Sequence, residues 1–327
     1  MDQLPSELVI QIIKELALPN NDRAYAITQD AMTTLCQLSL TSHVLWELCR
    51  PHLYERAVVK PSNIASFCRT IVQNGQHNRR APFSATELGL RVKSLALLHF
   101  DEEPTMAQTR HIASIFYALG PTLERLFMDV FLRQVDYASP LENDLAVSLK
   151  DATRRLSNLE EFCRTEHLPW NMDPMPWASG RTLKRVALLS VSLHYKLVDS
   201  FSTLANVEEA VIAFPILSGT QRVGAHMDRI FEVIPRMKEF LLVGANYPIY
   251  SRGFRAHVGE FMESPEMASE LDGRSERVKV VEVMELQPFQ VDHREGWFTS
   301  HVLSGQLWSL EGKQAWREYA SLGWGAN

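Results

Sequence analysis

Seven short segments recur along this chain and constrain its fold more than any other feature of the sequence. Each opens with an apolar residue, continues in most cases with a charged or polar pair, and ends in alternating apolar positions. They are VKSLALL (92–98), LERLFMDV (123–130), LEEFCRT (159–165), LKRVALLSV (183–191), VEEAVIAF (207–214), MKEFLLVG (237–244) and VKVVEVME (278–285). Apolar alternation with a period of two residues indicates a β-strand in each segment.

Helical stretches lie between several of these strands. Residues 106–119, 142–156 and 224–234 carry apolar residues at helical spacing, and glycine and proline residues mark the boundaries. The strand segments start 24 to 41 residues apart, which leaves room for a helix and two turns in each unit. This alternation predicts an α/β fold in which parallel strands are joined by helical crossovers.

Charged residues occupy the early positions of the predicted strands. They include the adjacent pairs Glu160-Glu161 and Glu208-Glu209. We expect these residues to be solvated at the starts of their strands, with the two members of each pair on opposite faces of the sheet. A doubly wound sheet has uniformly apolar strands, so the pattern favours a curved sheet with one face on helices and one face open to solvent. The region 92–290 resembles an irregular leucine-rich-repeat solenoid, with a plain α/β domain as the alternative.

The last segment, 291–327, contains four of the seven tryptophans and no further strand pattern. Solenoids need an atypical end unit that covers the apolar face of the final repeat. We therefore interpret 291–327 as a helical C-terminal cap. A ligand pocket lined by its aromatic residues is the alternative.

Residues 1–56 predict three short helices, which together are too small for a stable core of their own. The apolar side chains of the first helix cover roughly 200° of its surface, about twice the stripe that packing on one core requires. A second apolar helix is expected over 33–40. The third follows Ser42 as N-cap, with Pro51 just beyond its end. Residues 57–91 are expected to form a linker that leads into the first repeat.

The N-terminal residues also resemble a known family. LPSELVIQIIKEL, followed by LCQLSLTSHVLWELCRPHLYERAVV, is similar to the F-box, with a longer polar connection after the first helix. The F-box is the three-helix module through which a substrate receptor docks on the Skp adaptor of a Skp–cullin–F-box ubiquitin ligase. The resemblance assigns adaptor binding to Leu4, Pro5, Glu7, Leu8, Ile12, Leu35, Leu38, Leu40, Thr41 and Ser42.

Composition and motifs argue against several other classes of protein. The net charge of −6 disfavours nucleic acid as the main partner, and no apolar run reaches the ~18 residues of a membrane span. Asp2 and Glu7 interrupt the first apolar region, so no signal peptide is expected. The four cysteines show no paired spacing, which favours a reducing compartment, cytoplasmic or nuclear. Cys49-x-x-His52 lacks further ligands, so neither a metal nor a cofactor is expected.

No nucleotide-binding, metalloprotease or serine-hydrolase motif occurs, so we expect no catalytic residues and no enzyme. The F-box resemblance implies a substrate-recognition subunit that binds a Skp-type adaptor, and a cullin through it. The repeat region would bind a target protein by residues that the sequence leaves unknown. One alternative is a ligase-independent scaffold whose N-terminal helices only cap the solenoid. Another is a small-molecule-binding α/β protein that uses Trp297 and the tryptophan-rich tail.

Overall fold

The structure is a computed structural model of the chain. It describes residues 5–17, 24–72, 91–100, 104–130, 140–165, 182–190, 204–214, 230–245, 277–283, 291–310 and 313–314. The chain divides into two compact units. Unit 1 comprises Met1–Asn158 with Ser300–Ser309, and unit 2 comprises Leu159–Thr299 with Leu310–Asn327.

Unit 1 begins with three helices, which we call the N-terminal module: α1 (Ser6–Ala17), α2 (Gln29–Ser39) and α3 (His43–Glu55). The predicted cap of α3 is confirmed, because Ser42 Oγ accepts a hydrogen bond from the Leu45 N–H at 3.2 Å. The predicted end of α3 is wrong. Pro51 lies inside the helix, which continues for another turn to Glu55 and brings Leu53 against the module core.

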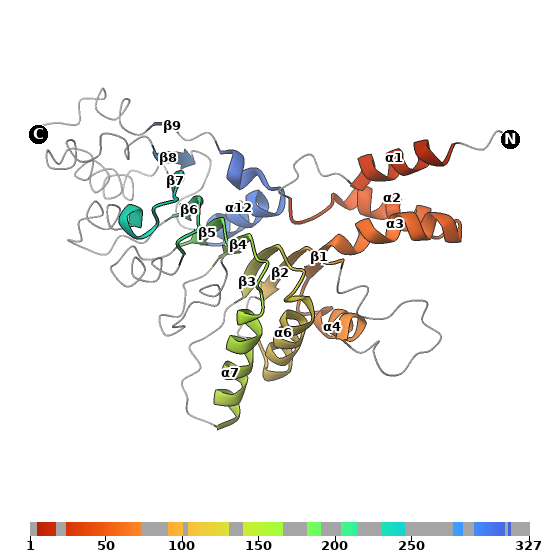
Figure 1. The fold of residues 1–327 in the computed structure, drawn as a ribbon, viewed down its shortest axis with the longest axis horizontal. Helices are drawn as coiled ribbons and strands as arrows, with labels where there is room; N and C mark the ends of the chain where they lie inside the picture. The colour runs from red at the N-terminus through yellow and green to blue at the C-terminus, as the bar shows by residue number, and fades with distance from the viewer. Residues whose placement is uncertain are drawn as a thin grey trace, which may run out of the picture. The chain divides into compact units, whose positions relative to one another are not determined.

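A parallel sheet follows directly in unit 1. Strand β1 (Arg56–Val59) begins at the residue after α3, and pairs with β2 (Ser94–Phe100), which pairs with β3 (Arg125–Val130). The helices α4 (Ile64–Val72), α6 (Met106–Leu119) and α7 (Pro140–Arg154) lie together on one side of these strands (Figure 1). The expected helix over 106–119 is confirmed. Within 57–91, expected to form a linker into the first repeat, β1 extends to Val59 and α4 covers Ile64–Val72.

Unit 2 continues the alternation with five parallel strands paired in chain order. They are β4 (Glu161–Arg164), β5 (Arg185–Leu189), β6 (Glu209–Ala213), β7 (Glu239–Ala245) and β8 (Val278–Val283). All seven strands predicted from the recurring segments are thus present, as β2–β8, and the α/β fold with parallel strands is confirmed. The short strand β9 (Lys313–Gln314), which pairs antiparallel with β8, was not predicted.

The segment expected to form a cap is helical in its first part. Helix α12 (Val291–Leu303) is followed by the 3-10 helix η4 (Gln306–Ser309), and the boundary between the units falls inside α12. In unit 2 the Trp297 ring packs edge-on against Phe214, with ring centroids 5.6 Å apart. Trp316 and Trp324 lie outside the described residues.

The expectation of one solvent-open sheet face is wrong. Neighbouring strand residues point to opposite faces, yet Leu95, Ala96 and Leu97 of β2 are all fully buried. In unit 2, Val186, Ala187 and Leu188 of β5 are buried in the same way. Both faces of these strands are therefore covered. The charged strand starts, which suggested an open face, have another role.

Those charged residues form ion pairs between neighbouring strands. Lys93 pairs with Glu124 at 3.3 Å in unit 1, and Lys184 pairs with Glu160 at 3.2 Å in unit 2. Lys238 pairs with Glu208 and, through its hydrogen bond, lowers the pKa of that carboxyl below its ordinary value. Basic and acidic residues thus face each other across these strand pairs, which favours the observed neighbours over pairings that oppose like charges.

One acidic strand start is fully buried, which corrects the expectation that Glu160-Glu161 is a solvated pair. Glu161 accepts a hydrogen bond from Arg185 Nε at 2.7 Å, and its side chain has no exposed surface, whereas that of Glu160 is 41% exposed. The two neighbours therefore lie in very different dielectric environments. A buried carboxylate depends on its cation far more than an exposed one does.

We expect Glu161→Gln to lower the free energy of unfolding by about 2–3 kcal/mol, because Arg185 then loses its buried counter-charge. The matched control Glu160→Gln breaks an exposed pair and costs at most ~1 kcal/mol. Urea unfolding of both variants measures the difference. Equal losses in the two variants would contradict the buried pair.

Helix packing in unit 1 requires a glycine at one position. A Cβ added at Gly120 would lie 2.8 Å from the Arg155 carbonyl oxygen, a backbone atom just after α7, whereas a Cβ on Gly296 in α12 would meet nothing within 4 Å.

We expect Gly120→Ala to destabilise the protein by about 1–3 kcal/mol. Gly296→Ala, the control, should be neutral or stabilising by up to ~1 kcal/mol. Thermal unfolding that leaves Gly120→Ala unchanged would refute the close approach.

Candidate docking surface on the N-terminal helices

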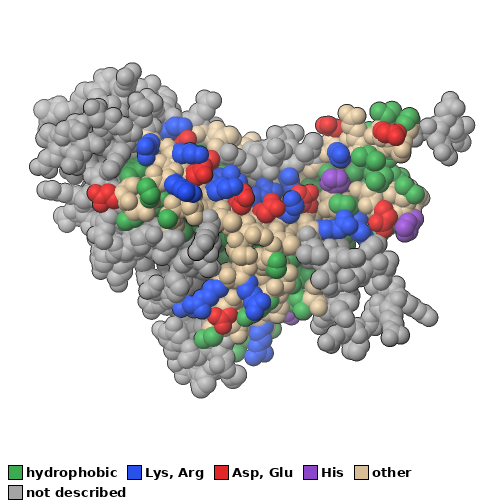
Figure 2. Space-filling view, viewed as in Figure 1, with side chains coloured by type: hydrophobic (Ala, Val, Ile, Leu, Met, Phe, Trp, Pro, Cys, Tyr) green, Lys and Arg blue, Asp and Glu red, His purple; other side chains and the backbone are tan. Residues whose placement is uncertain are grey.

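Hydrophobic side chains gather on the surface of the N-terminal module (Figure 2). Of the eight large hydrophobic residues that are exposed in the described part of the chain, four belong to this module. The exposed fractions are 47% for Leu8, 49% for Ile12, 86% for Leu40 and 68% for Val44. We call these four residues the docking surface, because exposed apolar groups of this kind commonly mark interaction sites.

The wide apolar face of α1 serves two purposes. One flank packs into the module core, where Ile13 and Ala17 are buried and Val9 and Leu16 are partly buried. The other flank carries Leu8 and Ile12, one helical turn apart, and faces away from that core. The excess width of the predicted apolar face is therefore the half-exposed part of α1 that lies outside the module core.

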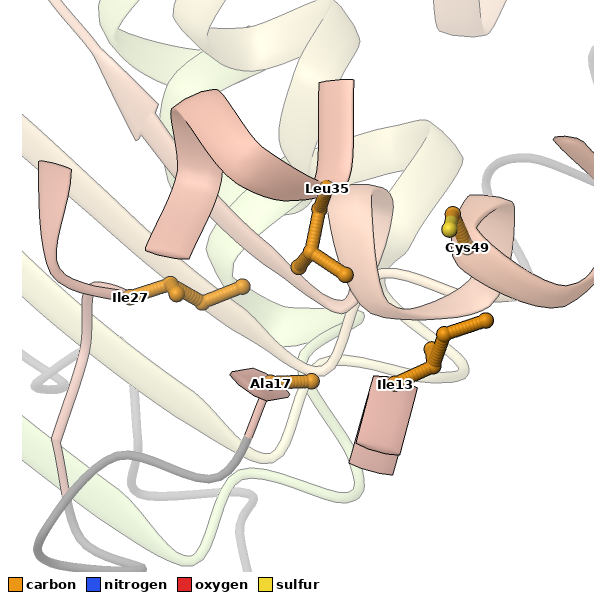
Figure 3. Packing of buried hydrophobic residues seen from close by; sticks show 5 residues of the cluster. All are labelled: Ile13, Ala17, Ile27, Leu35 and Cys49. Carbon is orange, nitrogen blue, oxygen red and sulfur yellow. The ribbon is translucent and has the colours of Figure 1, made fainter. Parts of the chain in front are cut away.

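The core beneath the docking surface is small and contains residues from all three helices. Ile13 and Ala17 of α1, Leu35 of α2 and Cys49 of α3 point towards one another together with Ile27, which precedes α2 (Figure 3). Leu38 packs against this cluster and is only partly buried. Leu35, which the sequence assigned to adaptor binding, is fully buried and has no surface to offer a partner.

The turn between α2 and α3 presents Leu40 at its tip. The Leu40 N–H donates to the Gln37 carbonyl at 3.1 Å, and Thr41 Oγ1 donates to the Leu38 carbonyl at 2.8 Å. These bonds, with the Ser42 cap, fix a tight turn whose polar groups are satisfied internally. The Leu40 side chain is left in solvent at a defined position, which is a suitable arrangement for an anchor residue.

The remaining predicted residues divide into two groups. Pro5 and Glu7, at the start of α1, are exposed, as are Thr41 and Ser42. Leu4 lies outside the described residues. Val44 was not predicted as a site residue. Its helical spacing from Glu47 and Pro51 is the signal that places it on the outer face of α3.

The polar residues beside the docking surface pair within α3 or are buried. Glu47 lies 4.0 Å from His43 and 3.4 Å from the nearly buried Arg50, so its charge is held within α3. Cys49, the nearest thiol to His52 in sequence, is fully buried, and burial raises its pKa above the ordinary value. Within the described ranges no group of three or more His, Cys, Asp or Glu residues is arranged to hold a metal ion.

Comparisons with known proteins add no family to this description, since neither the models of protein families nor the curated proteins give a match. None of the helices in the described ranges combines the length and the apolar character that crossing a bilayer requires. The functional assignment therefore depends on the motif resemblance of the N-terminal residues and on the geometry of the docking surface.

The module contains one group with a defined pH dependence. Burial lowers the pKa of His52 below its ordinary value of 6.5. Glu55 opposes this shift, whereas Lys14 and Arg56 add to it. The unfolded chain therefore binds a proton at His52 more readily than the folded one does, so stability is full above pH 6.5 and falls below it. We expect wild type to lose more thermal stability than His52→Gln between pH 7.5 and pH 5. Identical pH profiles would contradict this role of His52.

Proposed function

We propose that the docking surface binds a Skp-type adaptor and that this chain is a substrate receptor of a Skp–cullin–F-box ubiquitin ligase. The single observation that carries the proposal is the exposure of Leu8, Ile12 and Leu40. These three residues belong to the sequence motif that resembles the F-box, and they project from a three-helix module instead of entering its core. Burial of such side chains is the main source of interface affinity.

We also propose that the strands β2–β8 belong to an irregular leucine-rich-repeat-like solenoid that binds the target protein. A repeated hydrogen-bond arrangement supports this idea. In unit 1 the Lys93 carbonyl accepts bonds from two consecutive N–H groups, those of Glu124 and Arg125. In unit 2 the same arrangement recurs at the carbonyls of Glu160, Lys184 and Glu208, each of which accepts from the first residue of the next strand and from the residue before it. Such geometric equivalence is typical of stacked repeats.

In this proposal the chain supplies proximity and not chemistry. A receptor that holds a target near the ligase converts a bimolecular encounter into an intramolecular one and so raises the effective concentration of the target. Catalytic groups would then lie on other subunits.

The second candidate function is a ligase-independent scaffold in which the N-terminal module only caps the repeats. The direct connection from α3 to β1 is compatible with both functions. A cap, however, is expected to present a polar outer face, and the outer face of this module carries Leu40 and Val44. Docking on an adaptor therefore explains the exposure of Leu40 and Val44, which the cap function does not explain.

The proposal predicts that Leu40→Ala with Val44→Ala, and separately Leu8→Ala with Ile12→Ala, weaken binding to a purified Skp-type adaptor. Each pair removes anchors that carry about 2 kcal/mol or more, so Kd should rise at least ~30-fold. Isothermal titration calorimetry measures the change. Circular dichroism should stay unchanged because the substituted residues are exposed.

A matched control is Val72→Ala with Val147→Ala, which removes exposed apolar side chains from α4 and α7, where they are 43% and 52% exposed. This control should bind the adaptor as wild type does. If wild type shows no binding, or if all three double variants bind equally well, the docking function is refuted and the scaffold is favoured.

A further inference from the structure

The connection between α1 and α2 is buried at three of its apolar residues. The sequence marks this connection as a polar insertion into the F-box-like motif, yet Ala24 is 2% exposed, Tyr25 fully buried and Ile27 8% exposed. Ile27 belongs to the module core with Ile13 and Leu35. The segment 24–27 is therefore attached to the module core through Ile27. Its other contacts attach it to the sheet of unit 1.

Tyr25 packs on the sheet of unit 1. Its ring meets Phe127 edge-on, with centroids 6.1 Å apart, and the Arg125 guanidinium lies 5.6 Å from the ring centre. Arg125 and Phe127 are alternate residues of β3 and so share one face of the sheet. A single aromatic side chain thus contacts this face at two successive positions, through an aromatic pair and a cation–π contact.

The backbone beside Tyr25 is held by two further elements of unit 1. The Tyr25 N–H donates to the Leu303 carbonyl at 2.9 Å, at the last residue of α12. Arg56 Nη1, at the start of β1, donates to the Ala24 carbonyl at 3.1 Å. Contacts therefore tie this segment to β1, β3 and the end of α12, which are far apart in the chain.

We propose that residues 24–27 act as a clamp that fixes the orientation of the N-terminal module relative to the β1–β3 sheet, with Tyr25 as its positioning residue. Helix α3 runs directly into β1, and at this step the Lys93 N–H donates to the Glu55 carbonyl at 2.9 Å. The clamp adds a second attachment, from Ile27 in the module core to Tyr25 on the sheet. The docking surface is then held in one direction with respect to this sheet, whatever partner it binds.

This inference goes beyond the proposed function, because it concerns the orientation of the module and not the identity of its partner. It is tested on the full chain without any adaptor. Spin labels are placed at Gln11→Cys on α1 and Arg110→Cys on α6, both exposed positions of unit 1, in a Cys36→Ser background that removes the exposed native thiol. Double electron–electron resonance then measures the distance distribution between module and sheet helices.

We expect a narrow distribution in the parent protein and in Tyr25→Phe, which keeps the ring. Tyr25→Ala should broaden it at least about twofold while the circular dichroism spectrum and the protection of β1–β3 from hydrogen exchange persist. Tyr117→Ala is the matched control, since it removes another aromatic side chain of unit 1 that has a cation–π partner, Arg155 at 4.8 Å, but that lies on α6 and outside segment 24–27. The distance distribution of Tyr117→Ala should remain narrow.

Two results would overturn the clamp. A narrow distribution in Tyr25→Ala would show that the α3–β1 connection alone sets the orientation. Loss of hydrogen-exchange protection throughout β1–β3 would show that Tyr25 supports the core of the unit and has no separate positioning role. Neither result bears on adaptor binding, so failure of the clamp and failure of the docking function are distinguishable.

Discussion

Parallel pairing of strands in chain order is the constraint on which the rest of this structure depends. A parallel neighbour is reached only through a crossover, and each crossover must return the chain to the correct position on the previous strand. The double hydrogen bond to the carbonyls of Glu160, Lys184 and Glu208 sets that position in unit 2. Ion pairs such as Lys184 with Glu160 lie at the same strand starts. Register and charge thus act together where each strand begins.

The N-terminal module meets a different demand, because three short helices bury too little surface to be stable alone. Its core around Leu35 and Cys49 is extended by the connection that carries Ile27 and, through Tyr25, by the sheet of unit 1. Support from the sheet allows α1 and the α2–α3 turn to leave Leu8, Ile12 and Leu40 in solvent. In our proposal the stability of the module and its availability to an adaptor are therefore linked.

The strands and α6 could be predicted because their signals are local: a period of two or of 3.6 residues within one segment. The burial of Glu161 could not, because it depends on Arg185, 24 residues later, as the neighbour across the strand pair. Tyr25 was missed for a similar reason, since its partners belong to β3 and to the end of α12, far away in the sequence. Within the site, Leu8, Ile12 and Leu40 were predicted and are exposed. Leu35 is a core residue, and Val44 required the orientation of α3 to be known.

Hydrogen exchange of the full chain, with and without a saturating Skp-type adaptor, measures directly which elements the adaptor covers. We expect added protection in α1 and in the segment from Leu38 to Leu48, and no added protection in β4–β8 of unit 2. Protection confined to β4–β8, or no change anywhere at a saturating adaptor concentration, would contradict the assignment of docking to the N-terminal helices.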